Sequence, residues 1–100
     1  MRKYQTHDEY LIETLKDPKE AALYLNAAAE ENDPALLLVA LAQVAKAHGH
    51  SHMARKMAIS RMGLYKSLSK NGNPEFKTFI KLIAASGLQL AFKPKPALAA

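Results

Sequence analysis

The chain has 100 residues, no cysteine and a formal net charge of +5. A chain of this length forms one domain with a modest core, and without cysteine it has neither disulfides nor thiolate metal sites. The charges are segregated, because residues 1–33 carry four Lys or Arg against eight Asp or Glu, whereas residues 34–100 carry ten cations and the single anion Glu75. A basic half favours a polyanionic partner, and an acidic half favours a basic one.

Neither a membrane segment nor a secretory leader is expected. The longest apolar run, in residues 35–45, stops at Lys46 and is too short to span a bilayer. Residues 1–10 are polar and charged, unlike a secretory leader. We therefore expect a cytoplasmic protein without a membrane partner.

The first half of the chain carries clear helix-start signals. Thr6 and Glu9 form a capping-box pattern that opens a short helix. The dipeptide Asp-Pro occurs at residues 17–18 and again at residues 33–34, where Asp can cap a helix and Pro can occupy its first position. Three helices are therefore predicted before residue 49.

The second and third of these helices are predicted over residues 18–31 and 34–48. Gly49 supplies the stop of the third helix. The third helix is expected to be the central packing helix, and its apolar face consists of Leu37, Leu41, Val44 and Ala45.

The most informative stretch is residues 51–74, which predicts two short helices joined by a tight turn. Ser51 and Ser60 stand where a side-chain oxygen can cap each helix. The residues expected to pack the two helices together are Ala54, Met57, Ile59, Leu64 and Leu68. The second helix turns outward Arg61, Met62, Gly63 and Lys66. Small and basic residues on an exposed helix are typical of a helix-turn-helix that reads the major groove of DNA.

A further helix and a short strand are predicted after this pair. Asn71-Gly72 breaks the chain, and Asn73-Pro74 is expected to start a helix that ends at Ser86-Gly87. Alternation of apolar and other residues then predicts a short strand that contains Leu88, Leu90 and Phe92. A single strand needs a partner, so we expect it at an edge or in an intermolecular pair.

These residues resemble a known family, the small antidote (antitoxin) proteins of bacterial addiction modules that carry a helix-turn-helix of the phage-repressor type. The resemblance covers roughly residues 17–90, and its most specific part is the block LYKSLSKNGNPEF. It implies an all-α fold of five to six short helices. It also implies a homodimer that binds double-stranded DNA at an inverted repeat in its own promoter and neutralises a small basic toxin of the RelE or ParE type.

The resemblance extends to individual positions and has two departures. Ser60-Arg61 match the family's turn-and-entry pair, and Tyr65-Lys66 match its Tyr-Lys step. Ala58 stands where the family usually has the turn glycine, so a residue expected at positive φ carries a Cβ. Met62-Gly63 replaces the polar pair that relatives present to bases. The operator preference of relatives therefore does not transfer.

Two sets of candidate site residues follow. The DNA-binding candidates are Ser51, His52, Ser60, Arg61, Met62, Gly63, Tyr65, Lys66, Lys70 and Asn71. Arg61 is the best base reader among them, since its guanidinium can bind guanine with two hydrogen bonds, and His52 lies where a helix N-terminus meets a phosphate. The partner-binding candidates are Tyr24, Leu25, Leu88, Leu90 and Phe92.

We divide the chain into an acidic N-terminal helical region (1–33), a helix-turn-helix DNA-binding domain (34–92) and a flexible tail (93–100). His48, His50 and His52 alternate, but three imidazoles without a nearby carboxylate or thiolate do not favour a metal site. No catalytic constellation is present, so neither an enzyme nor a cofactor is expected. Two alternatives stay open: a solitary phage-type repressor, and a protein-interaction module without useful DNA binding.

Overall fold

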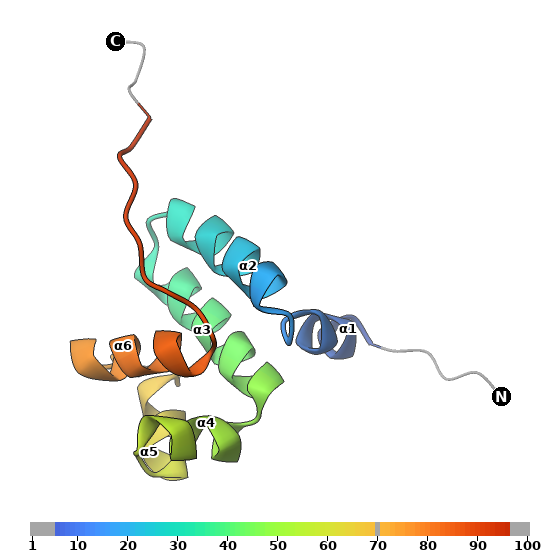
Figure 1. Ribbon diagram of the computed structural model, residues 1–100, viewed down its shortest axis with the longest axis vertical. Helices are drawn as coiled ribbons and strands as arrows, with labels where there is room; N and C mark the ends of the chain where they lie inside the picture. The colour runs from blue at the N-terminus through green and yellow to red at the C-terminus, as the bar shows by residue number, and fades with distance from the viewer. Residues whose placement is uncertain (1–5, 70, 97–100) are drawn as a thin grey trace, which may run out of the picture.

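The computed structural model describes residues 6–69 and 71–96, and this part of the chain forms six helices and no strand. The all-α prediction is thereby confirmed. In Figure 1, α2 and α3 lie side by side, α1 lies near one end of α2, and α4, α5 and α6 gather at the other end of the molecule. The helices are α1 (His7–Thr14), α2 (Pro18–Glu30), α3 (Pro34–His48), α4 (His50–Met57), α5 (Arg61–Ser67) and α6 (Phe76–Ala85).

The first three helices begin where their start signals predict. Thr6 and Glu9 form both bonds of the capping box, with the Glu9 N–H donating to Thr6 Oγ1 over 3.0 Å and the Thr6 N–H donating to Glu9 Oε1 over 2.8 Å. Asp17 and Asp33 each accept a hydrogen bond of 3.0 Å from the backbone N–H two residues further on. Both Asp-Pro predictions are confirmed.

The central helix is α3, as predicted, and it packs against α1, α2 and α4. An ion pair of 3.1 Å between Lys46 and Asp8 joins α3 to α1 at the surface. Seven of the sixteen buried apolar residues are alanines, so the helices approach one another closely. This core consists of Leu15, Ala21, Leu25, Ala28, Ala40, Leu41, Val44, Ala45, Ala47, Met53, Ala54, Met57, Leu64, Leu82, Ile83 and Ala85.

Two predicted helix starts are wrong. Helix α4 begins at His50 directly after Gly49, which has φ of 92° and leaves α4 without a side-chain cap, so Ser51 lies exposed inside the first turn. Helix α6 begins at Phe76 rather than at Pro74, and Glu75 precedes it without a capping side-chain bond. The reason is that the loop before α6 packs against the end of α5, which keeps Pro74 outside the helix.

Gly72 accounts for that loop. A Cβ at this position would collide with the backbone carbonyl oxygens of Lys66 and Ser67, so the loop can lie on the end of α5 only because residue 72 has no side chain. The Gly72 N–H also donates to the Ser69 carbonyl oxygen over 2.7 Å. The glycine of the Asn-Gly-Asn-Pro sequence is therefore required where the backbone of this loop closely approaches the backbone at the end of α5.

The predicted C-terminal strand is wrong. Residues 88–96, which we call the arm, are extended without regular secondary structure. The described residues, 6–69 and 71–96, contain no strand with which they could pair. Helix α6 ends in a Schellman motif. The Leu88 N–H donates to the Ile83 carbonyl, and the Gly87 N–H donates to the Ala84 carbonyl, with Gly87 at a φ of 77°. Leu88 then packs against the core. The alternating apolar residues are therefore one residue that packs on the core, Leu88, and two exposed residues, Leu90 and Phe92, and they do not form a β-strand.

Candidate nucleic-acid interface

Helices α4 and α5 are joined by a three-residue turn, residues 58–60. Ala58 has φ of 58° and ψ of 42°, which confirms the predicted left-handed residue. The Ile59 N–H donates to the Ala54 carbonyl over 3.0 Å and the Ala58 N–H to the Arg55 carbonyl over 3.2 Å, so this turn is also a Schellman motif. An L-residue in this conformation costs about 1–2 kcal/mol. The hydrogen bonds and packing of the turn must offset that cost.

Buried side chains fix α5 against α4. Met53 and Met57 of α4 and Leu64 of α5 are fully buried, and Ile59 and Leu68 pack partly buried beside them. Helix α4 also packs against α6. The contacts predicted between the two short helices are therefore confirmed, and they leave the opposite side of α5 to solvent.

The start of α5 is built around Ser60 and Gly63. Ser60 Oγ accepts a hydrogen bond of 2.9 Å from the Gly63 N–H, so the predicted Ser60 cap is confirmed. A Cβ on residue 63 would lie 3.0 Å from that same oxygen, which is tighter than an ordinary contact. The glycine inside α5 thus allows the cap to approach closely.

The exposed side of α5 presents Arg61, Met62, Tyr65 and Lys66. The Tyr65 ring stacks on His50 of α4, with ring centroids 4.3 Å apart and planes at 22°, and Arg61 Cζ lies 5.6 Å from the centre of the Tyr65 ring. Burial, and then the charges of Arg61 and Lys46, lower the pKa of His50. The neutral imidazole of His50 therefore stacks on one side of the Tyr65 ring, and the same ring makes a cation–π contact with the Arg61 guanidinium.

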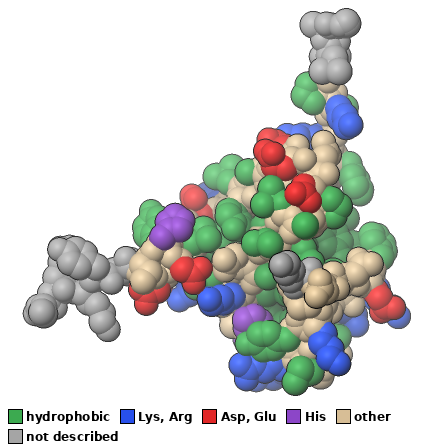
Figure 2. All heavy atoms as spheres, turned by 180° about the vertical axis from the view of Figure 1, so that it is seen from behind, with side chains coloured by type: hydrophobic (Ala, Val, Ile, Leu, Met, Phe, Trp, Pro, Cys, Tyr) green, Lys and Arg blue, Asp and Glu red, His purple; other side chains and the backbone are tan. Residues whose placement is uncertain are grey.

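The neighbouring cations divide into two groups. Arg55 is exposed, whereas Lys56 Nζ donates to the Ala85 carbonyl over 3.1 Å and so binds the C-terminal end of α6. The Lys56 ammonium group is thus already bound to the protein's own backbone. Lys70 lies outside the described residues, and Asn71 is exposed beyond α5. Figure 2 shows Lys and Arg side chains, and no Asp or Glu, at the lower end of the molecule formed by α4 and α5.

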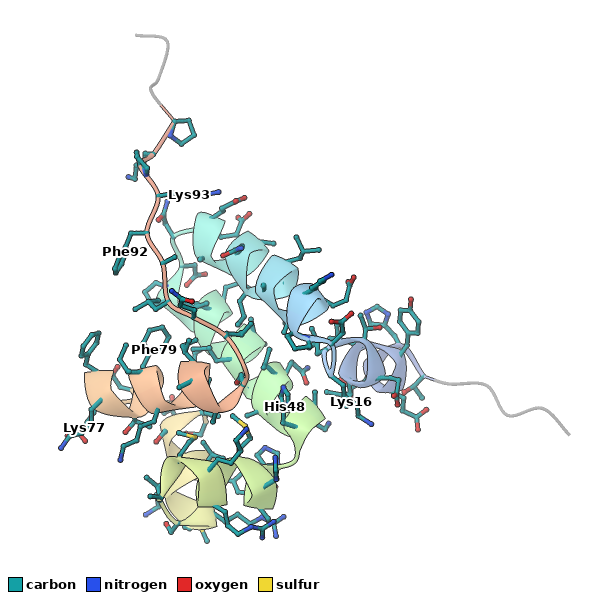
Figure 3. The ribbon with its side chains drawn as sticks, viewed as in Figure 1. Lys16, His48, Lys77, Phe79, Phe92 and Lys93 are labelled. Carbon is teal, nitrogen blue, oxygen red and sulfur yellow. The ribbon has the colours of Figure 1, made fainter. Side chains whose placement is uncertain are left out.

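The three alternating histidines have separate surroundings. His48, at the end of α3 (Figure 3), has a buried Nε2 that lacks a hydrogen-bond partner among the described residues. Burial, followed by the charges of Lys56 and His52, lowers its pKa. His50 stacks on Tyr65, and His52 is exposed in the first turn of α4 beside Ser51. Within residues 6–69 and 71–96, His, Cys, Asp and Glu form no group of three suited to a metal ion.

The partner-binding candidates do not form one surface. Leu25 is only 9% exposed and belongs to the core, Tyr24 packs partly buried beside it, and Leu23 is the exposed leucine of α2, at 65%. The sequence did not identify Leu23 as exposed, because the alanines around it are compatible with burial of either face of α2. On the arm, Leu88 is half-buried, whereas Leu90 and Phe92 face solvent.

Comparison with known proteins decides the family. The family model described as "Probable addiction module antidote protein" matches residues 5–94. The chain belongs to this family. It is also similar to a protein of Haemophilus influenzae described as "Uncharacterized protein", with 44% identity over 85 residues that cover 85% of this chain and 88% of the relative. No solved structure matches the chain significantly.

Membership of the antidote family agrees with the resemblance seen in the sequence, and it implies a toxin partner in general. The family description suggests a regulatory protein rather than an enzyme. No helix among the described residues of this antidote protein has the length and apolar character needed to cross a membrane.

Proposed function

We propose that this antidote protein is the antitoxin of a type II toxin–antitoxin module and represses its own operon by binding an inverted repeat through α5. The observation that carries the proposal is the exposed side of α5, where Arg61 and Lys66 face solvent on a helix fixed by the Ser60 cap and the buried Leu64. One recognition helix covers few base pairs, so a homodimer places two of them about 34–36 Å apart on one duplex.

Each exposed residue has a distinct role in this proposal. Arg61 binds a guanine edge bidentately, a contact worth about 1–3 kcal/mol of discrimination. Met62 contacts a thymine methyl group, and Lys66 and Asn71 lie along the phosphates, whereas Lys70 stays a phosphate candidate from the sequence alone. At the start of α4, Ser51 and His52 meet a phosphate on the backbone N–H groups of the first turn. Gly63 carries no side chain and so lets the α5 backbone approach the groove.

The stack of His50 on Tyr65 supports the assignment of Arg61. A free arginine side chain loses rotamer freedom on binding, at a cost of about 1.5–2 kcal/mol. Because the Tyr65 ring already restricts the Arg61 guanidinium, less of that freedom remains to be lost when the base contact forms. The tyrosine is therefore a positioning residue rather than a base reader.

Gel-shift titrations on the protein's own promoter and on random duplex test this proposal. Arg61→Ala should weaken the specific complex roughly 10-fold or more and the random complex far less. Lys19→Ala, which removes the same charge from the distant α2, is the control and should change neither. Equal losses on both duplexes would reduce Arg61 to a phosphate contact.

Salt dependence separates the proposal from its alternatives. Affinity should fall steeply with salt, and Lys66→Ala should flatten the slope by about one counterion. Absence of binding at low salt would favour the protein-interaction module. Specific binding without a toxin gene beside the operator would favour the solitary repressor.

For the toxin, we propose the acidic region formed by residues 1–33. It carries Asp8, Glu9 and Glu20 in the first turns of α1 and α2, and exposes the large apolar residues Tyr10 and Leu23. Acidic charge steers a basic toxin of the RelE or ParE type toward this region, and the apolar residues supply the contact. The division of the chain into an acidic region (1–33) and a DNA-binding region (34–92) belongs to the same proposal.

Point substitutions test the toxin surface better than truncation. Leu15 is 1% exposed and contacts the core, so deletion of residues 1–16 would damage the fold. Leu23→Ala should weaken rescue of growth when the toxin is co-expressed, without loss of DNA binding. Met62→Ala, an equally exposed apolar truncation on α5, should do the opposite. Full rescue by Leu23→Ala at matched expression would place the toxin surface elsewhere.

A further inference from the structure

An open apolar groove of 520 Å³ lies outside the surface considered for DNA. It is lined by the first half of α3, the loop after α5 and the first turns of α6. Its lining residues are Pro34, Ala35, Leu37, Leu38, Leu41, Gly72, Asn73, Pro74, Phe76 and Phe79. Phe76 remains 74% exposed at the rim. An open apolar hollow of this kind has room for an apolar side chain from a partner.

The same chain also presents an apolar projection. Phe92 on the arm is 91% exposed and is not among the residues that line the groove. Figure 3 shows Phe92 projecting from the arm on the same side of the view as Phe79 of α6. The Schellman turn at Gly87 and the packed Leu88 set the course of the arm past the start of α3, so the side chain of Phe92 is held away from its own helices.

We propose that the groove receives the arm of a second copy of this chain, with Phe92 of each copy seated in the groove of the other. The inference rests on the homodimer of the proposed function and assigns its surface. A two-fold dimer uses the same patch on both copies, so one chain must carry both halves of the contact. This chain carries the apolar projection and the apolar hollow together.

Charge complementarity also favours the arm as occupant. Phe92 is followed by Lys93 and Lys95, and the wall of the groove at Pro34 is preceded by the exposed Glu31 and Asp33. Within one copy, Lys93 Nζ already lies 3.9 Å from a carboxylate oxygen of Glu30 at the end of α2. An arm that inserts Phe92 near Ala35 brings its two lysines to this acidic end of the α2–α3 turn.

The available apolar area is adequate for a small dimer interface. A phenylalanine buries about 150–250 Å² in a contact. With Phe76 74% exposed and Phe92 91% exposed, the four phenylalanines of two copies supply about 500–800 Å² before the groove walls and Leu90 are counted. A specific interface requires about 1,000 Å². The rest of that area has to come from the arms, their lysines and the groove walls.

The position of the groove links such a dimer to α5. Gly72 and Asn73, which line the groove, belong to the loop that lies on the last carbonyls of α5. A second copy seated there contacts this loop from outside. Dimerisation through the groove therefore restrains the loop that follows the helix proposed to enter DNA.

Sedimentation equilibrium of the full chain, without DNA or toxin, measures the proposed contact. Phe92→Ala should raise the dimer dissociation constant at least about 10-fold, and so should Ala35→Arg, which fills the groove and repels the arm lysines. Both positions are exposed, so the fold should persist, and an unchanged circular dichroism melt checks this. Tyr10→Ala, an exposed aromatic truncation on α1, is the control and should leave the constant unchanged.

Mixing the two variants identifies the exchange of arms. Phe92→Ala retains an intact groove and Ala35→Arg an intact arm, so a mixed dimer recovers one of the two contacts and forms more tightly than either variant alone. A monomeric wild type, an unchanged constant in Phe92→Ala, or no recovery on mixing would overturn the proposal. Loss of toxin capture in Phe92→Ala with self-association intact would also overturn it, by assigning the groove to the toxin. DNA binding is measured separately, so its failure would leave the assigned dimer surface standing.

Discussion

Substitution of Ala58 by glycine should stabilise the protein, although it removes a side-chain atom. Ala58 has φ of 58°, and an L-residue in this conformation costs about 1–2 kcal/mol that glycine does not incur. Glycine gives the unfolded chain more freedom, which opposes the gain by about 0.4–1 kcal/mol. The two ranges leave a net gain in the free energy of unfolding with a middle value of about 0.8 kcal/mol, or roughly 3–6 °C in the melting temperature of a domain of this size.

Urea and thermal denaturation followed by circular dichroism measure this difference. Ala27→Gly is the matched control, because Ala27 is exposed in the interior of α2, where glycine should cost about 0.5–1 kcal/mol. The same chemical change is thus expected to have opposite signs at two positions. If Ala58→Gly destabilises the protein as much as Ala27→Gly does, the turn between α4 and α5 holds no backbone strain, and that reasoning is refuted.

Three further perturbations follow from the same structure. Gly72→Ala should destabilise the protein by more than about 1 kcal/mol, the lower end of the usual cost of overpacking. The reason is that its Cβ would collide with the backbone carbonyls of Lys66 and Ser67. An unchanged urea midpoint would show that the loop can move away without cost. Ser60→Ala should cost about 1 kcal/mol through loss of the α5 cap, and an equal loss in Ser51→Ala would contradict the assigned caps. Burial lowers the pKa values of His48 and His50 below 6.5 in the folded state, so the unfolded chain binds these protons first and stability should fall as the pH drops below about 6.5. His48→Gln should remove part of that fall, and the same slope in both proteins would assign it to His50 or another group.

Local rules predicted much of the helical framework. Thr6, Asp17, Asp33 and Ser60 all cap helices as their sequence neighbours indicate, since a cap depends on residues only two or three positions away. The left-handed conformation of Ala58 was expected from the resemblance instead, because this residue stands where the family usually has the turn glycine. Within the candidate site, the same local reasoning identified the residues on the exposed side of α5.

The errors occur where a distant contact decides the outcome. Pro74 does not start α6, because Gly72 draws the preceding loop onto the end of α5. Leu25 is buried and Leu23 exposed, since α3 selects one face of an alanine-rich helix whose pattern permits both. The hydrogen bond from Lys56 to the Ala85 carbonyl is of the same kind, because it joins residues 29 positions apart and no local pattern predicts it.

Because the core is rich in alanine, bound ligands contribute a large share of the free energy of unfolding. Seven of its sixteen residues bury a single methyl group each, so the core removes less apolar surface from water than one of leucine and isoleucine would. Any species that binds only the folded chain adds RT ln(1 + [L]/Kd), about 2.7 kcal/mol at a hundredfold excess over Kd. For a small core, that increment is a large share of the whole free energy of unfolding. The fraction of unfolded chains in a cell therefore depends on how many folded ones are occupied.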